Sequence, residues 1–329
     1  MDMTYEQWQQ ARKHIQRKMS VSGWAVLIYY GIVNVSVMGF LFAQVLGKLF
    51  QGLISEDYAS ITDAVMQSAE NAWGYFFAAA VGMLILLIWK KPRFFKEEIF
   101  ASGAPMKIWD FFTILCIFIG GQMVFQFCTM LLELILNLFG YTIAGGLELL
   151  QSEPDNFSMF LYAGILAPVV EELLFRGLVQ RTMLPFGKKL AIVVSSLLFG
   201  LYHGNLIQTP YAFAVGLVLG YVAAEHNILW AMVLHMINNL VLGDLLYRLL
   251  VGFSQDTVDM IVWGIIFAFF VAALILIIVR RKEIDEWQRR EPIVRAYASC
   301  YFSSPATIVL LISLGASTLF TTGKMITPL

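Results

Sequence analysis

Long apolar segments separated by polar loops dominate the sequence. A helix of about 17 to 25 apolar residues is long enough to cross the hydrocarbon core of a bilayer. Nine segments reach or approach that length, and we place them at residues 21–46, 72–89, 108–139, 158–179, 190–206, 211–224, 228–243, 258–279 and 305–321. The sixth and seventh are short, and the third is long. The pattern predicts an all-α fold, a polytopic membrane helix bundle with about eight to nine transmembrane helices.

The composition supports a membrane protein. Hydrophobic residues make up 59% of the chain and charged residues 14%, against roughly 25% charged residues in a soluble domain. The net charge is −1, and no Lys/Arg run is long enough to indicate a nucleic-acid partner. Three cysteines without a Cys-x-x-Cys pair indicate neither a disulfide framework nor a zinc motif.

The charges of the loops predict an orientation. Basic residues gather before the first segment and after the second, fourth and eighth, whereas the intervening loops, such as the one with Glu56, Asp57, Asp63 and Glu70, are acidic or neutral. By the positive-inside rule this places the N-terminus in the cytosol of a multi-pass protein, which we expect in the cell membrane. Residues 1–20 are predicted to form a cytosolic amphipathic leader, and no cleaved signal peptide is indicated.

Three charged residues interrupt the apolar sequence between residues 167 and 181, namely Glu171, Glu172 and Arg176. A charge at that depth costs at least ~3 kcal/mol, so such groups face a protein interior or a cavity and need partners. Glu172 and Arg176 are four residues apart with the acid first, the favourable order for a helical ion pair. Glu171 lies about 100° round the helix and has no obvious local partner. We therefore predict that the pair braces the helix and that Glu171 is free for chemistry.

Further polar residues follow in the later segments. Phe199 and His203 lie four residues apart in the fifth segment, as do His235 and Asn239 in the seventh, with Asn238 alongside. Each has a structural explanation when taken singly, such as a core histidine bonded to a carbonyl or an asparagine joining two helices. Gln122 is assigned such an interhelical hydrogen bond. Polar groups gathered on three neighbouring segments indicate a functional site instead.

These groups suit the hydrolysis of an amide. A low-dielectric site disfavours the charged form of a carboxylate, which can then act as a base near neutral pH. One imidazole can hold a water beside that carboxylate, and a second imidazole with a carboxamide offers two donors to a developing oxyanion. Gly-x-Ser-x-Gly, His-Glu-x-x-His and phosphate-binding loop motifs are absent from the sequence.

The motifs Glu171-Glu172-x-x-x-Arg176, Phe199-x-x-x-His203 and His235-x-x-x-Asn239 resemble, in order and separation, those of the CPBP family. This family comprises the CAAX prenyl endopeptidases and bacteriocin-processing enzymes, also called type II CAAX proteases or Abi proteins. The resemblance implies an all-α, glutamate-dependent intramembrane endopeptidase. It implies that Glu171 activates a water, that His203 helps to hold it, and that His235 and Asn239 form the oxyanion hole. Glu172, which we count among the catalytic residues, and Arg176 would position the helix, supported by Phe199 and Asn238.

The resemblance also divides the chain. We expect N-terminal transmembrane helices over residues 21–157, the catalytic core over 158–243, and C-terminal transmembrane helices with a cytosolic loop over 244–329. The expected partners are a peptide or protein substrate and membrane lipid, and the substrate stays open between a prenylated C-terminal peptide, a double-glycine bacteriocin leader and a signalling-peptide precursor.

Several alternatives stay open at this point. No cofactor is expected, although zinc is the main rival because the family was long described as metalloproteases. The sequence has no His-x-x-x-His pair, which favours the metal-free mechanism. A non-catalytic immunity or regulatory partner is the second function, and a proton-coupled transporter is the third, for which we expect an inverted repeat and find none.

Overall fold

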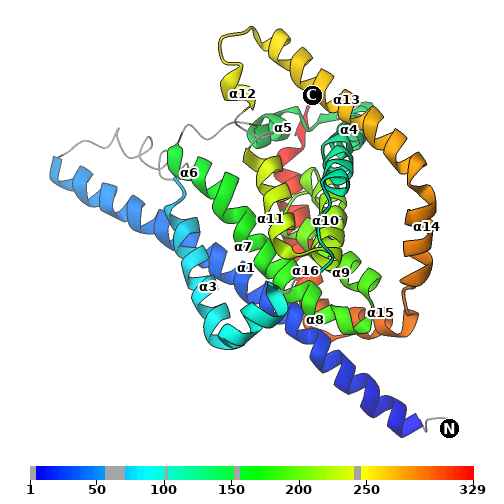
Figure 1. The fold of residues 1–329 in the computed structure, drawn as a ribbon. Helices are drawn as coiled ribbons and strands as arrows, with labels where there is room; N and C mark the ends of the chain where they lie inside the picture. Colours follow the sequence, from blue (N-terminus) through cyan, green and yellow to red (C-terminus); the bar gives the residue numbers. More distant parts are fainter. Residues whose placement is uncertain (1–4, 56–70, 101–102, 152–155, 241–245) are drawn as a thin grey trace.

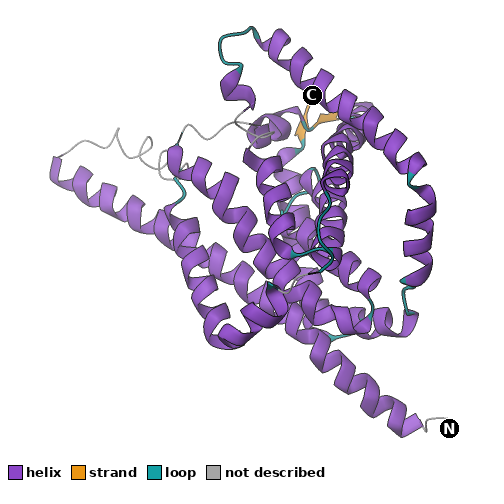
Figure 2. Ribbon diagram, viewed as in Figure 1, coloured by secondary structure: helices purple, strands orange, loops and turns teal. Residues whose placement is uncertain are grey.

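The computed structural model describes residues 5–55, 71–100, 103–151, 156–240 and 246–329. Helices make up nearly all of this part of the chain (Figure 2), which confirms the prediction of an all-α polytopic bundle. Two short strands, β1 (Tyr141–Thr142) and β2 (Thr327–Pro328), pair antiparallel. The acidic loop with Glu56, Asp57, Asp63 and Glu70 and the boundary predicted at 243/244 lie outside the described residues.

Figure 1 labels the helices in chain order. Their bounds are α1 (Tyr5–Ser55), α3 (Trp73–Phe94), η1 (Phe95–Ile99), α4 (Ile108–Leu138), α5 (Ala144–Gln151), α6 (Phe157–Leu161), η2 (Tyr162–Leu166), α7 (Ala167–Glu172), η3 (Leu173–Gln180), α8 (Arg181–Met183), η4 (Leu184–Phe186), α9 (Lys188–Tyr202), α10 (Gln208–Glu225), α11 (Ile228–Met236), α12 (Leu246–Leu249), α13 (Gln255–Val279), α14 (Arg281–Arg290), α15 (Arg295–Phe302) and α16 (Pro305–Met325).

Within the residues that the structure describes, six stretches of helix are long and apolar enough to cross a membrane, which supports an integral membrane protein. They are Glu6–Gln51, Trp73–Lys90, Ile108–Leu138, Phe157–Phe186, Gln255–Val279 and Pro305–Met325. The other three predicted spans correspond to the shorter helices α9, α10 and α11. These lie in the middle of the bundle (Figure 1), where most of their apolar side chains are buried against protein.

Helix α1 continues without a break through the predicted leader and the first predicted span. Its N-terminal part is held by Arg12 and Gln16, whose Nη2 and Nε2 donate to the Ser303 hydroxyl oxygen at 3.1 and 2.9 Å. Farther along, the Tyr30 hydroxyl donates to Ser317 Oγ on α16 at 2.7 Å. Helices from the two ends of the sequence therefore pack side by side.

The span that carries the two glutamates alternates between α-helical and wider π-helical turns. The short helix α7 lies between the π-helical stretches η2 and η3, and Pro168 stands at its start. Proline has no N–H to donate to the preceding turn, which favours such a local widening. Glu171 and Glu172 end this short α-helical segment and so precede a change of helical pitch.

Helices α9 and α10 approach each other closely at glycines. A methyl group at Gly200 would lie 2.8 Å from the Thr209 carbonyl oxygen, and one at Gly216 would lie 3.0 Å from Ser196 Cβ. Gly200 and Gly216 therefore allow the two helices to pack closely. Gly204 differs, because it follows the end of α9 with a φ of +70°, a conformation that favours glycine.

We expect Gly200→Ala to lower the melting temperature of the purified protein. The added methyl meets backbone and not a movable side chain, and overpacking of this kind costs about 1–3 kcal/mol. Gly264→Ala in α13 is the matched control, because nothing lies within 4 Å of a methyl group there. Equal melting temperatures for the two variants would contradict the close contact.

Helix α14 lies on the outside of the bundle (Figure 1) and is attached to the ends of α9 and α10. Lys188 Nζ lies 2.8 Å from Glu225 Oε1 and 3.5 Å from Glu291 Oε1, and Trp287 Nε1 donates to Glu225 at 2.8 Å. Partial burial alone would lower the pKa of Lys188, but the hydrogen bond and charge of Glu225 outweigh it and raise that pKa. This polar cluster fixes the segment between α13 and α15.

Candidate active site

Glu172 and Arg176 form the ion pair that their spacing predicts. Arg176 Nη1 donates to Glu172 Oε1 at 3.0 Å, and both side chains are fully buried. Arg176 Nη2 also donates to the Gly216 carbonyl at 3.2 Å, and its guanidinium carbon lies 4.3 Å from the centre of the Phe199 ring. One turn on, Gln180 Nε2 donates to the Gly220 carbonyl at 2.8 Å. These contacts fix η3 against α9 and α10.

His235 lies between the two glutamates. Its Nδ1 is 3.0 Å from Glu172 Oε1, and because the ion-paired carboxylate can only accept, Nδ1 carries the proton. Its Nε2 is 3.8 Å from Glu171 Oε2, beyond hydrogen-bonding distance. The Glu171 side chain is 16% exposed, whereas that of Glu172 is 0% exposed. Of the two neighbouring carboxylates, Glu171 is therefore the accessible one.

His203 is brought to the same region by Phe199. Its Nδ1 lies 2.8 Å from the Phe199 carbonyl oxygen, an acceptor, so Nδ1 carries the proton and Nε2 is left as an acceptor in the neutral ring. The Phe199 ring contacts both imidazoles edge to face, with centroid distances of 4.8 Å to His203 and 5.5 Å to His235. Glu171 also lies close enough to His203 for its negative charge to interact with the imidazole. The two histidines predicted to share a site thus flank one aromatic ring.

Asn239 belongs to a chain of hydrogen bonds that joins four helical segments. Its Nδ2 donates to the Ala163 carbonyl at 3.0 Å, and its Oδ1 accepts from Asn238 Nδ2 at 3.0 Å. Asn238 Oδ1 in turn accepts from the Tyr211 hydroxyl at 2.7 Å and from Gln122 Nε2 at 3.3 Å. A carboxamide nitrogen has two N–H groups, so Asn239 keeps one donor after bonding Ala163. The interhelical role predicted for Gln122 is confirmed.

The family model for the type II CAAX prenyl endopeptidase Rce1-like proteins matches residues 153–241, the segment that contains all of these groups except Gln122. This match supports the assignment of residues 153–241 to the CPBP family. The CPBP match indicates a peptidase. No curated protein and no solved structure matches the chain. Helices α1, α3, α4 and α13 to α16 lie outside the matched CPBP segment.

The CPBP site does not present a set of zinc ligands. A zinc site requires three or four protein ligands about 2 Å from one point. Within the described ranges, no three His, Cys, Asp or Glu side chains are grouped in a way that could hold a metal ion. We therefore derive no chemical step through a metal.

Two tyrosine hydroxyl groups lie near this candidate site, and no sequence pattern identified them as part of it. Tyr211 orients Asn238, and Tyr29 on α1 lies close enough to Glu171 for the carboxylate to act on it electrostatically. A single tyrosine in an apolar span is ordinary in a membrane protein. Only the packing of distant helices shows what these side chains contact.

Proposed function

We propose that this CPBP protein is an intramembrane endopeptidase that hydrolyses a peptide bond of a peptide or protein substrate through a water activated by Glu171. The contrast between the two glutamates carries the proposal. Glu172 is fully buried and bonded to Arg176 and His235. The Glu171 carboxylate is partly accessible, and its Oε2 lies 3.8 Å from His235 Nε2. A general base needs this combination of access and a neighbouring polar group.

The proposed reaction uses two hydrogen-bond acceptors, the Glu171 carboxylate and His203 Nε2. A water bound between Glu171 and the Nε2 of His203 gives a proton to Glu171, and its oxygen attacks the carbonyl carbon. When the tetrahedral intermediate breaks down, the carbon–nitrogen bond is cleaved and Glu171 returns the proton to the leaving amine. The products are a carboxylic acid and an amine, which exchange a proton to become a carboxylate and an ammonium, and His203 holds the water without itself changing charge.

His235 and Asn239 supply the oxyanion hole in this proposal. When His235 carries protons on both nitrogens, Nδ1 donates to Glu172 and the Nε2–H is available to the oxyanion. The second N–H of Asn239 is the other donor, and the bond from Asn238 fixes which way that carboxamide points. Removing one such donor typically lowers kcat by about 10²–10³.

Tyr211→Phe is expected to lower kcat by roughly fivefold with little change in stability. The substitution removes the bond that holds Asn238 Oδ1, a net contribution of about 1 kcal/mol, and so loosens Asn239. The control is Tyr221→Phe on the same helix, whose ring contacts Trp287 far from the asparagines. Steady-state kinetics on the best peptide provide the measurement, and equal kcat values for the two variants would contradict the role of Asn238.

The experiment that tests the proposed function is cleavage of a quenched fluorescent peptide library by detergent-purified protein. The library includes prenylated C-terminal peptides, double-glycine leaders and signalling-peptide precursors. We expect wild-type cleavage that a strong chelator does not affect and that Glu171→Gln abolishes. Loss on chelation would establish a metal enzyme. An inactive wild-type protein would favour a non-catalytic regulatory partner.

A further inference from the structure

Two tyrosines that no motif includes lie around Glu171. The Glu171 carboxylate lies close enough to act electrostatically on the hydroxyls of Tyr29 and Tyr162, and Tyr29 lies close enough to act on Tyr162. Neither hydroxyl has a hydrogen-bonding partner within the described part of the chain. Tyr29 belongs to α1, outside the matched segment, and Tyr162 begins η2. The region beside the base therefore holds the hydroxyls of Tyr29 and Tyr162 as donors available to a substrate.

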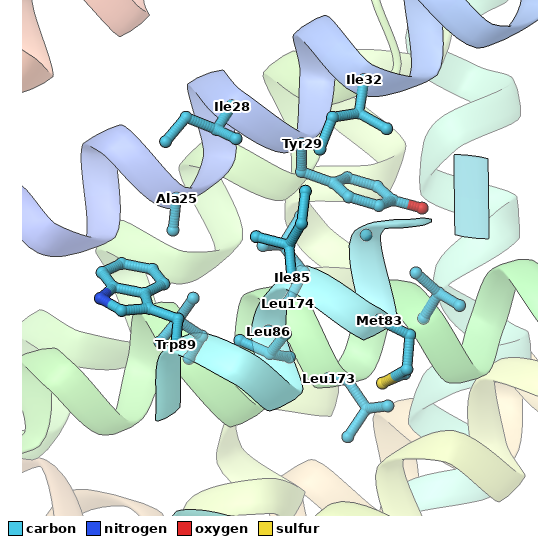
Figure 3. A pocket seen from close by; sticks show the side chains of 13 residues that line it. Ala25, Ile28, Tyr29, Ile32, Met83, Ile85, Leu86, Trp89, Leu173 and Leu174 are labelled. Carbon is cyan, nitrogen blue, oxygen red and sulfur yellow. The ribbon is translucent and has the colours of Figure 1, made fainter. Parts of the chain in front are cut away.

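Tyr29 also borders an apolar pocket between α1, α3 and the glutamate-bearing helix (Figure 3). The pocket is lined by Ala25, Ile28, Tyr29, Ile32, Gly82, Met83, Ile85, Leu86, Trp89, Val170, Leu173, Leu174 and Leu178. Val170, Leu173 and Leu174, which flank Glu171 in the sequence, are among these residues, so the pocket borders the helical segment that carries Glu171. In Figure 3 the Tyr29 hydroxyl points to the end of the pocket away from Trp89. Tyr29 thus borders the pocket and also lies within electrostatic reach of Glu171.

Helix α3 positions both tyrosines. The Tyr29 ring packs directly on Gly82, where an added methyl group would overlap with ring carbons. The Tyr162 ring lies 4.9 Å from the ring of Tyr75 and 6.0 Å from that of Phe76. A third tyrosine, Tyr202, is enclosed by the rings of Tyr29, Tyr30 and Phe175 and acts in packing.

We propose that Tyr29 and Tyr162 are substrate-binding residues whose hydroxyls donate hydrogen bonds to backbone carbonyl oxygens on either side of the scissile bond. An extended peptide has unpaired carbonyls, and an unpaired buried donor and acceptor are both costly. Attack requires the scissile carbonyl about 3 Å from the water at Glu171. The neighbouring carbonyls then lie about 3.5 Å farther along the peptide, and the proposal assigns one of them to each hydroxyl. This inference rests on the proposed hydrolysis at Glu171.

The first test is the split between KM and kcat. Tyr29→Phe and Tyr162→Phe are each expected to raise KM roughly fivefold and to leave kcat nearly unchanged, because backbone bonds away from the reacting carbonyl bind substrate and transition state alike. Tyr30→Phe is the matched control, since its hydroxyl bonds Ser317 on α16. An unchanged KM in both variants, with wild-type melting temperatures, would overturn the inference.

A second test distinguishes a direct hydrogen bond between Tyr29 and the substrate from an indirect effect of Tyr29 on packing. Each non-scissile peptide bond of the substrate is replaced in turn by an alkene, which removes one carbonyl. On the one analogue that lacks the carbonyl bound by Tyr29, the Tyr29→Phe substitution should raise KM no further. On every other analogue it should raise KM roughly fivefold, as a double-mutant cycle requires. A constant factor on every analogue would mean that Tyr29 acts only through packing.

Gly82→Ala offers an independent route to the same result. The methyl group displaces the Tyr29 ring, so KM should rise as in Tyr29→Phe, and the double variant should show no further rise. Additive effects would contradict the positioning role of Gly82. Cleavage retained by Glu171→Gln would overturn the proposed function itself, an outcome distinct from any of the tyrosine results.

Discussion

Replacing Glu171 by glutamine is expected to lower kcat by about 10²–10⁴ while the protein folds and inserts normally. Glutamine has the same shape as glutamate but cannot take a proton from water, and general-base catalysis accounts for a factor of this size. The substitution breaks no ion pair closer than 3.8 Å, so the melting temperature should stay near that of wild type. The measurement is single-turnover cleavage of the best library peptide.

The control for this variant is Glu148→Gln on α5, where the side chain is exposed. It removes the same charge away from the proposed site and should leave cleavage unchanged. If Glu171→Gln retains cleavage within tenfold of wild type, the water is activated by a different group. If it fails to fold, Glu171 has a structural role that its exposure does not indicate.

Arg176→Leu is expected to cause the largest loss of stability in the chain. It leaves the fully buried Glu172 carboxylate without its cation, and removing one partner of a buried ion pair costs about 3–5 kcal/mol. The bond to the Gly216 carbonyl and the contact with the Phe199 ring are lost as well. The expected result is a large drop in melting temperature and loss of cleavage.

Arg280→Leu gives the comparison for this prediction. Arg280 also pairs with a carboxylate, Asp110 Oδ1 at 2.6 Å, but both side chains are more than a quarter exposed. Pairs that water can reach contribute about 0–1 kcal/mol, so this variant should melt close to wild type. Similar drops for Arg176→Leu and Arg280→Leu would contradict the importance of burial.

Local spacing was enough to predict part of this site. Glu172 and Arg176 are four residues apart on one helix, and their pairing is a property of that helix alone. The cost of placing polar groups in a bilayer then singled out His203, His235 and Asn239 on other helices. These groups do lie near one another in the structure, around the Phe199 ring and the carbonyl of Ala163.

The contacts made by Tyr29, Gly82 and Ala163 could not be predicted in the same way. Each depends on how helices far apart in the sequence pack, and no spacing rule reports such packing. The π-helical turns on either side of α7 also lack a sequence signal apart from Pro168. The three shorter predicted spans became interior helices because their apolar residues are covered by protein.

The contact between α1 and α16 has a consequence for biosynthesis. Tyr30 and its acceptor Ser317 are separated by 287 residues, which a ribosome adding ~5–20 residues per second needs roughly 15–60 s to translate. Throughout that interval the α1 surface that α16 will cover is without its partner, and the motif-bearing helices are translated before that partner is. Membrane insertion of α16, and not of those helices, therefore completes the helix bundle.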